Sequence, residues 1–264
     1  MTETFSLETM KKYKPFVSMT LGARRQGKSV LNSHLATQLS DEFQLVISFT
    51  GSPMCNPELH GFMVENGYEW FQYSTWNNKL MKNLESQQLK LIHNGRKRHV
   101  LIICDDLVLN SEDKNSLEHL CCRGRHFFVS VLMLSVAYSN FPKTCRRSCD
   151  FMFLFSLGCQ SDRELLLSEF CQSRGTAEFY LTQICKEPYT CAVIGTNQKE
   201  QIICRYRAPY ATDKPNNLDQ QNIDHGASKN DNQHSANIPF SETHNQGHGE
   251  QQNVPQGIEQ ELVS

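Results

Sequence analysis

Apolar residues in roughly the first 210 positions form short, nearly continuous runs that alternate with segments of helical periodicity. Short apolar runs between turn residues are typical of buried strands, whereas apolar positions three and four residues apart indicate helices. The pattern predicts strands over 16–21, 44–49, 68–73, 99–104, 127–136 and 151–156. It predicts helices over 28–39, 77–93, 115–122, 162–171 and 176–185, and a closing hairpin formed by 189–194 and 201–206.

Strands that alternate with helices imply an α/β fold with a mostly parallel sheet and helices on both faces. The run HVLIIC at 99–104 is apolar at almost every position, as expected of a central parallel strand buried on both faces. A stretch of about 210 residues is long enough to bury the core of one such domain. We therefore predict a single α/β domain over residues 1–210.

The composition changes at residue 211, after which Asn, Gln, His, Ser and Gly dominate and Phe240 is the only aromatic residue. This segment has two lysines against eight acidic residues, so its net charge is −6, whereas residues 1–210 carry +4. Its few apolar residues cannot offset the entropy of ordering the chain. We predict that residues 211–264 form a disordered, acidic, Gln/Asn-rich tail. The basic charge of 1–210 permits contact with nucleic acid, although an ordinary solvated surface would also carry it.

The eleven cysteines are an odd number, and several lie inside apolar runs, which favours free thiols in a reducing compartment. The spacing of the cysteines and histidines between 119 and 149 is not that of a zinc finger, so we expect no zinc site. The N-terminal segment lacks the apolar stretch of a signal peptide. No apolar run approaches the ~20 residues that span a bilayer. We expect an intracellular protein with no membrane-spanning segment.

The stretch GARRQGKS, from Gly22 to Ser29, matches the phosphate-binding pattern G-x-x-x-x-G-K-[ST], also called Walker A, at every fixed position. A predicted strand precedes it and a predicted helix begins at its end, as this motif requires. The glycines let successive backbone N–H groups turn toward a phosphate, and the helix N-terminus adds partial positive charge. Lys28 would reach the β- and γ-phosphates, and the Ser29 hydroxyl would bind Mg²⁺. The predicted nucleotide-binding residues are Gly22, Ala23, Arg24, Arg25, Gln26, Gly27, Lys28, Ser29 and Val30.

An apolar strand that ends in two acids, VLIICDD at 100–106, provides the second half of such a site, the Walker B motif. The carboxyl ends of parallel strands meet at the edge of the sheet where ligands bind. Asp105 would hold Mg²⁺ through water, and Asp106 would orient and deprotonate the attacking water. The alternative is that the two acids cap a following helix.

The two motifs lie about 75 residues apart, which leaves room for further strands between them. This spacing favours the additional-strand class of P-loop NTPases over kinases, whose corresponding strands are adjacent. No N-K-x-D sequence marks a guanine site, since the nearest string is NQKE at 197–200. ATP is therefore the expected nucleotide, with Mg²⁺ as its cofactor.

The stretch GRHFFVSVLMLSVAYSNFPKTCRRSCD, at 124–150, resembles the genome-packaging ATPases of poxviruses, other large DNA viruses and Polinton-type elements, in the FtsK/HerA superfamily. With the two nucleotide motifs, the resemblance covers about 16–155, in the family's order. The matching positions are Arg125, His126, Ser130, Pro142, Arg146 and Asp150. The resemblance implies an ATP-hydrolysing motor that acts on double-stranded DNA, forms a homo-oligomeric ring and works with viral capsid or portal proteins. It implies a location in the infected host cell, in the cytoplasm, a viral factory or the nucleus, or with the virion.

The sensor position at the end of the 127–136 strand is usually Gln in this family, but here the alignment places Val136 there, with Ser135 beside it. Val cannot hydrogen-bond a phosphate or a water. Either Ser135 substitutes, or the alignment is shifted by one residue, or hydrolysis is slow. The resemblance also makes Arg146 a candidate catalytic finger that reaches into a neighbouring subunit, with Arg123 and Arg125 as alternatives.

Three functions remain open from the sequence. The leading one is a motor that drives double-stranded viral DNA into the capsid, with Arg96–Arg98, Lys143, Arg146 and Arg147 as candidate contacts to the DNA backbone. The second is a helicase or replication ATPase. The third is a nucleotide-binding assembly scaffold that does not hydrolyse ATP, which the Val136 departure keeps open.

Overall fold

A computed structural model describes residues 4–51, 57–170, 173–195 and 203–207. Its described strands form one sheet in the order β3–β2–β4–β5–β1–β6–β7–β8. The predicted tail, 211–264, and the tip of the predicted hairpin lie outside the described residues. The strands are β1 (Val17–Leu21), β2 (Leu45–Thr50), β3 (Trp70–Tyr73), β4 (Val100–Asp105), β5 (Val129–Ser135), β6 (Phe151–Leu154), β7 (Thr190–Gly195) and β8 (Ile203–Arg207).

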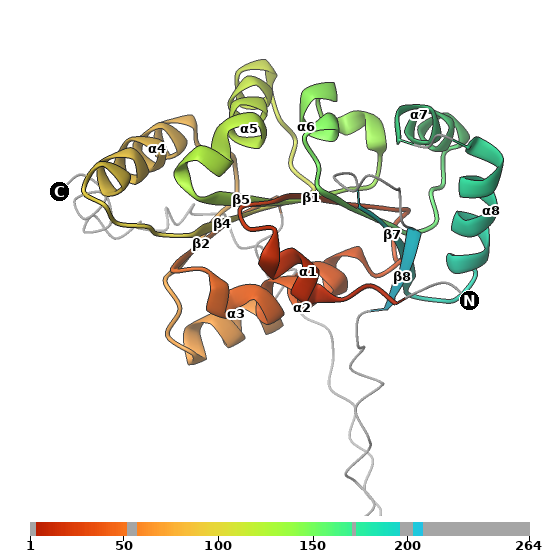
Figure 1. Cartoon of the computed structure of the whole chain (residues 1–264), viewed down its shortest axis with the longest axis horizontal. Helices are drawn as coiled ribbons and strands as arrows, with labels where there is room; N and C mark the ends of the chain where they lie inside the picture. The colour runs from red at the N-terminus through yellow and green to blue at the C-terminus, as the bar shows by residue number, and fades with distance from the viewer. Residues whose placement is uncertain (1–3, 52–56, 171–172, 196–202, 208–264) are drawn as a thin grey trace, which may run out of the picture. The chain divides into compact units, whose positions relative to one another are not determined.

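The helices pack on both faces of the sheet (Figure 1). One face is covered by α1, α2 and α3, the other by α4 to α7, and α8 packs beside β7 and β8. The helices are α1 (Leu7–Lys12), α2 (Lys28–Leu39), α3 (Pro57–Glu65), α4 (Asn78–His93), α5 (Ser111–Arg123), α6 (Lys143–Arg147), α7 (Gln160–Phe170) and α8 (Arg174–Ile184). Short 3₁₀ turns cover Ser40–Glu42, Gly124–Phe127 and Tyr138–Asn140.

The order of the strands confirms the additional-strand class of P-loop fold. Strands β1 to β6 are parallel to one another, and β7 and β8 add an antiparallel edge. Strand β5 lies between β1, which leads into the phosphate loop, and β4, which ends in Asp105. The strand that separates the two motifs in space therefore follows both of them in the chain, whereas β2 and β3, which lie between them in sequence, pair on the far side of β4.

Strand β1 is held at its start by hydrogen bonds from both neighbouring strands. The Phe16 N–H donates to Ser130 Oγ at 3.1 Å, and the Val17 N–H donates to Asp150 Oδ2 at 2.8 Å. The Asp150 N–H donates to the Val17 carbonyl at 2.7 Å. Burial raises the pKa of Asp150, and the bond from Val17 opposes that rise. Ser130 and Asp150, both part of the family resemblance, thus fix the position of the strand that leads into the phosphate loop.

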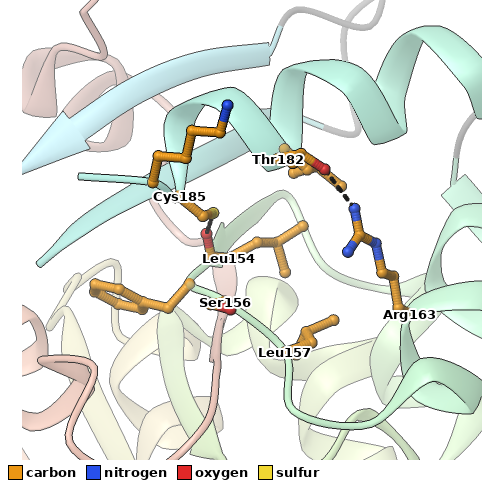
Figure 2. A pocket seen from close by; sticks show the side chains of 9 residues that line it. Leu154, Ser156, Leu157, Arg163, Thr182 and Cys185 are labelled. Carbon is orange, nitrogen blue, oxygen red and sulfur yellow. Dashed lines mark hydrogen bonds between the residues drawn. The ribbon is translucent and has the colours of Figure 1, made fainter. Parts of the chain in front are cut away.

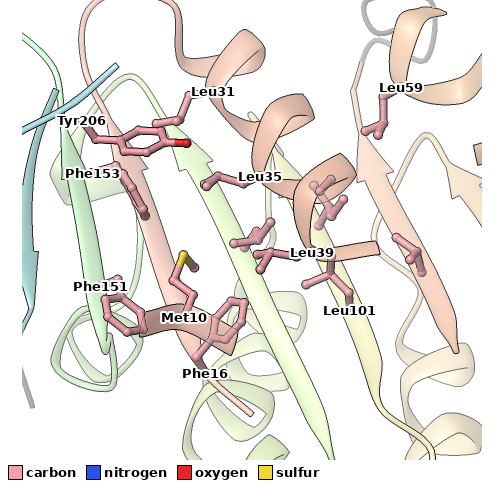
Figure 3. Packing of buried hydrophobic residues seen from close by; sticks show 14 of the residues in the cluster. Met10, Phe16, Leu31, Leu35, Leu39, Leu59, Leu101, Phe151, Phe153 and Tyr206 are labelled. Carbon is pink, nitrogen blue, oxygen red and sulfur yellow. The ribbon is translucent and has the colours of Figure 1, made fainter. Parts of the chain in front are cut away.

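The largest apolar cluster lies between the sheet and helices α1 to α3 (Figure 3). Leu31, Leu35 and Leu39 of α2 are fully buried there, and their four-residue spacing is part of the pattern that predicted this helix. Phe151 and Phe153 of β6 face the same cluster and pack edge-to-face against Phe5. Helix α2 is therefore attached to the sheet along its length, so the phosphate loop at its N-terminus has a rigid base.

Three helices were not predicted, namely α1, α3 and α6. Helix α3 begins with Pro57 in its first turn, where proline is tolerated, but the breakers Thr50, Gly51 and Pro53 upstream suggested a loop. The helix predicted at 115–122 is longer, because Asn110 and Asp113 form a capping box that starts it at Ser111. Strand β5 is shorter than the predicted strand 127–136. Phe127 ends a 3₁₀ turn and the backbone of Phe128 is left-handed, with φ of 62°, so the strand begins at Val129.

The burial of α2 predicts unequal costs for two leucine truncations. Leu35→Ala removes a side chain with 0% exposure and should lower the free energy of unfolding by about 2–5 kcal/mol. Leu89→Ala, on α4 with 50% exposure, is the matched control and should change it by less than about 1 kcal/mol. Denaturant unfolding of both variants measures the difference, and equal losses would contradict this packing.

Candidate functional site

The phosphate loop lies between the end of β1 and the start of α2, where Gly27 precedes the first helical residue, Lys28, with φ of 99°. Gly22 approaches the segment after β6 so closely that an added Cβ atom would lie 2.5 Å from the Cβ atom of Phe155. Only glycine fits at that position without displacing the neighbouring backbone. The Ala23 N–H donates to the Ser156 carbonyl at 2.9 Å, which attaches the loop to the end of β6.

A cavity of about 190 Å³ opens at the carboxyl edge of the sheet beside this loop. It brings together side chains from both nucleotide motifs and from the end of β5. The lining residues are Arg24, Arg25, Lys28, Ser29, Asp105, Asp106, Leu134, Ser135 and Val136. Of the other predicted binding residues, Gly22, Ala23, Gln26 and Gly27 belong to the loop backbone, and Val30 is 38% exposed on the first turn of α2.

Lys28 points back onto its own loop, where its Nζ donates to the Ala23 carbonyl at 2.8 Å. Burial lowers the pKa of Lys28, while the nearby carboxylates of Asp106 and Asp105 oppose that change. The ammonium group is thus positioned between the loop and the two acids, within the cavity that the sequence predicts for the β- and γ-phosphates.

The two acids at the end of β4 differ in environment. Asp105 is half-buried, and burial raises its pKa, with a further rise from Asp106 and an opposing effect of Lys28. Asp106 is exposed and left-handed, with φ of 49°, a conformation that costs a non-glycine residue about 1–3 kcal/mol. Neither acid caps the next helix, since α5 begins at Ser111 and is capped by Asn110. The alternative interpretation of these acids as a helix cap is therefore wrong.

The donors in this cavity fit a magnesium ion. Ser29 and Asp105 offer a hydroxyl and a carboxylate oxygen, the hard ligands that Mg²⁺ prefers, and this ion keeps most of its waters. Behind Asp105 a small cavity is lined by Asn32 and Trp70, whose buried Nδ2 and Nε1 groups have no hydrogen-bond partner among the described residues. The cavity has about 10 Å³ of space, enough for roughly one water that these N–H groups would bind beside Asp105. A bound ion would offset the negative charge of the phosphates.

The sensor position falls on Ser135 and Val136, and both line the cavity. Ser135 Oγ accepts hydrogen bonds from Asn140 Nδ2 at 2.9 Å and from the Ala137 N–H at 3.2 Å. With its oxygen engaged in this way, the Ser135 hydroxyl can donate its proton toward the cavity. The arrangement favours Ser135 as the substitute for the usual amide. Asn140 was not singled out from the sequence, because nothing local marks it as the partner of a residue five positions away.

Arg146, the predicted arginine finger, is engaged within its own subunit. It is 8% exposed, and its Nε and Nη2 donate to the two Glu169 carboxylate oxygens at 3.2 and 3.0 Å. Its Nη1 donates to the Phe141 carbonyl at 2.7 Å, and its guanidinium lies 4.6 Å from the centre of the Tyr138 ring. The prediction that it reaches a neighbouring subunit is not supported, because these contacts within the subunit use the whole guanidinium fork.

The alternative fingers, Arg123 and Arg125, lie before β5, at the amino edge of the sheet and away from the cavity.

Asp162 holds the same region as Arg146, since its carboxylate accepts hydrogen bonds from the N–H groups of Tyr138 and Ser139 at 3.1 and 3.3 Å. The segment that follows β5 is therefore fixed by helix α7.

Within the described residues, no group of three or more His, Cys, Asp or Glu side chains is arranged to hold a metal ion. The described cysteines are all free thiols. Among the described helices, none combines the length and apolar character needed to cross a bilayer.

Comparison with known protein families identifies the chain. The family described as "Poxvirus A32 protein" matches residues 2–175, more than half of the sequence. This chain belongs to the poxvirus A32 protein family. The match confirms the resemblance to viral packaging ATPases, and the chain is a P-loop ATPase of that type. A search of curated proteins returned no significant match.

Solved structures share the fold at low sequence identity. The DNA-packaging ATPase B204 of Sulfolobus turreted icosahedral virus superposes with a TM-score of 0.54 and 13% identity, covering 72% of this chain and 97% of that chain. B204 of Sulfolobus turreted icosahedral virus 2, in complex with AMP, superposes with a TM-score of 0.53 and 12% identity, covering 72% of this chain and 96% of that chain. The conjugation coupling protein TcpA of pCW3 superposes with a TM-score of 0.53 and 11% identity, covering 74% of this chain and 60% of that chain.

The buried ion pair predicts that Arg146→Ala acts on stability. Removing the guanidinium leaves the half-buried Glu169 with the Tyr138 hydroxyl as its remaining described partner, so the free energy of unfolding should fall by about 1–3 kcal/mol. Arg147→Ala, which changes the exposed neighbour on the same helix, should have little effect. Thermal unfolding of both variants separates the roles: a true finger would lose turnover while keeping its melting temperature.

The raised pKa of Asp105 predicts a trade-off between stability and activity. A carboxyl group whose pKa is higher in the folded than in the unfolded protein destabilises the fold when it is ionised. This cost in free energy disappears as the pH falls below both pKa values. Asp105→Asn should therefore raise the melting temperature at pH 7, with a gain that shrinks toward pH 3, and should impair turnover. A pH series of unfolding curves tests this. A gain that grows on acidification would contradict it.

Proposed function

We propose that this ATPase translocates double-stranded viral DNA into a capsid, as a ring of identical subunits driven by ATP and Mg²⁺. The observation that carries the proposal is the single cavity in which Lys28, Ser29, Asp105 and Asp106 meet. A lysine, a hydroxyl and two acids at the edge of a parallel sheet are the groups that phosphoryl transfer from a nucleotide needs.

The residues divide the work in the following way. The loop backbone and Lys28 bind the phosphates, and Ser29 and Asp105 hold the ion. Asp106 is exposed and lines the cavity, so it orients the attacking water and accepts its proton. Ser135, held by Asn140, donates to the γ-phosphate or to that water.

Arg24 and Arg25 are the arginines of the cavity, and both are exposed. Since Arg146 is engaged within its own subunit, these two side chains are the better candidates for contacting phosphate or the adjacent subunit of a ring. B204, which shares the fold, is a packaging ATPase and has been solved with AMP, which supports nucleotide binding here. We place this activity in the infected cell, at the capsid or its portal.

Contacts to DNA are proposed at the amino edge of the sheet, opposite the cavity. The segments that precede β4, β5 and β6 all reach this edge, because the strands are parallel. Arg98 is paired there with Glu69, but Arg96, Lys97, Arg123 and Arg147 are exposed and form no ion pair with a described residue. Such side chains suit sequence-independent contact with phosphates. Lys143 is also exposed, whereas Arg146 is buried and unsuited to this role.

A helicase and a scaffold without turnover are the alternatives. The cavity disfavours the scaffold, because both acids and a hydroxyl at the sensor position face it. Strand separation of short duplexes by the pure protein would favour the helicase.

The motor is tested by DNA-stimulated phosphate release. Lys28→Ala should abolish turnover and weaken ATP binding, because the phosphates lose their cation. Asp106→Asn should retain binding but lower turnover by about 10²–10⁴-fold, the contribution of a general base. Tight ATP binding by wild type with no turnover above the Lys28→Ala background would exclude the motor and leave the scaffold.

Charge reversal at the amino edge tests the DNA contacts. The double variant Arg96→Glu/Arg123→Glu should weaken duplex DNA binding and reduce the slope of log K against log salt by about 2, the value for two phosphate contacts. Turnover without DNA should be unchanged. Lys79→Glu/Lys82→Glu, which reverses two exposed charges on α4, is the matched control. Equal loss in both variants would show that net charge, rather than this edge, governs binding.

A further inference from the structure

The small cavity behind Asp105 lies on the face of the sheet that α2 and α3 cover (Figure 1). Side chains alternate between the two faces of a strand, and Asp105 follows Leu101 and Ile103, which both pack in the apolar cluster on this face. Asp105 also lines the cavity beside the phosphate loop. Its carboxylate therefore separates the proposed ion site on one side from the small cavity on the other.

Two donors reach the small cavity from different elements. Asn32, on α2 and 3% exposed, accepts a hydrogen bond from Thr20 Oγ1 at 3.3 Å through its Oδ1. The opposite end of the amide, Nδ2, is thereby turned away from β1. Trp70 presents its buried Nε1 from β3. Buried N–H groups in proteins are almost always hydrogen-bonded, so these two donors indicate a place for an acceptor between α2, β3 and β4.

A larger cavity, of about 240 Å³, provides a contrast (Figure 2). It lies between the end of β6 and helices α7 and α8. There Arg163 donates to Thr182 Oγ1 at 2.6 Å, and Cys185 Sγ donates to the Leu154 carbonyl at 3.3 Å. These polar groups find their partners within the protein, which distinguishes them from the donors at the small cavity.

A single water satisfies both donors at the small cavity, whose volume of about 10 Å³ holds roughly one. A water that accepts hydrogen bonds from Asn32 Nδ2 and Trp70 Nε1 has used its lone pairs, so it must donate both of its protons. The strongest acceptor that lines the cavity is the Asp105 carboxylate, to which no described residue donates directly. The second proton can go to a hydroxyl oxygen, of Ser48 or Thr50. Two donors are thus converted into one directed at Asp105.

We propose that Asn32 and Trp70 are positioning residues for the magnesium ion, because through one shared water they fix the orientation of the Asp105 carboxylate toward it. The proposal rests on the proposed function for the ion itself. Carboxylates that bind metals are themselves hydrogen-bonded, and loss of such outer partners lowers metal affinity about 10–100-fold. Helix α2 then supplies a ligand, Ser29, and one turn later the support for the second ligand.

The test measures the affinity of the full chain for a non-hydrolysable ATP analogue by calorimetry, with Mg²⁺ and with EDTA. Asn32→Leu, similar in size but without a donor, should reduce the gain in affinity due to Mg²⁺ about tenfold and leave the affinity in EDTA unchanged. Trp70→Phe should act in the same direction. Trp76→Phe is the matched control and should change neither affinity, since Trp76 Nε1 donates to Asn78 Oδ1 at 2.9 Å, outside the cavity.

A double-mutant cycle separates positioning from a general loss of structure. In the Asp105→Asn background, Asn32→Leu should cause no further loss of the gain due to Mg²⁺, because both changes act on the same contact with the ion. Losses that simply add, or that are equally large in EDTA, would overturn the proposal, as would an unchanged gain in both Asn32→Leu and Trp70→Phe.

The indole N–H signals provide a readout that does not depend on affinity. The chain contains two tryptophans, so its proton–nitrogen NMR spectrum has two such signals, which Trp76→Phe assigns. Mg²⁺ added to the analogue complex should move the Trp70 signal in the wild type but not in Asp105→Asn. A Trp70 signal that stays in place in the wild type would contradict the shared water. The proposed motor fails differently, through wild-type protein that binds ATP with Mg²⁺ but does not hydrolyse it.

Discussion

The position of β1 is the constraint on which the rest of this structure depends. Two acceptors, Ser130 on β5 and Asp150 before β6, take the first N–H groups of this stretch from opposite sides. A strand held at its start by both neighbours cannot slide by a residue without breaking both bonds. Since the phosphate loop follows β1 directly, that register also decides where the loop leaves the sheet. Two residues that carry the resemblance to packaging ATPases therefore act at the edge opposite the chemistry, by fixing the position of β1.

The same constraint fixes the phosphate loop against its neighbours in the sheet. The loop is attached to β6 through Ala23 and Ser156, and it meets the acids of β4 across β5. Helix α2 continues from the loop into the largest apolar cluster, where its buried leucines fix it against the sheet. Because interiors are close-packed, this base resists small shifts. The groups proposed to bind phosphate and ion thus belong to one rigid unit.

Much of this arrangement could be predicted from the sequence, because the informative signals are local. GARRQGKS and VLIICDD each combine a strand with the turn or acid that follows it, and a parallel sheet brings such ends to one edge. The class of fold followed from the same motifs, although the inserted strand, β5, is encoded after both. Helix α3 was missed because breakers lie just upstream of it.

Arg146 shows where sequence reasoning fails. Its partner Glu169 is 23 positions away on another helix, so no spacing rule connects them. The same holds for Asn140 and Ser135, and for the orphan N–H groups of Asn32 and Trp70 behind Asp105. Such pairs depend on tertiary packing, which local patterns do not encode. The positions of charged side chains after the sheet has formed therefore have to be read from the structure.

The bond between Lys28 and the Ala23 carbonyl has a consequence for selectivity. Any anion that enters the loop must displace a neutral carbonyl dipole from the ammonium group before it gains that contact. A multiply charged polyphosphate replaces the dipole with a much stronger electrostatic partner, whereas a weakly charged anion gains little by the exchange. The lysine in its resting position therefore acts as a threshold that filters ligands by charge density, ahead of any recognition of their shape.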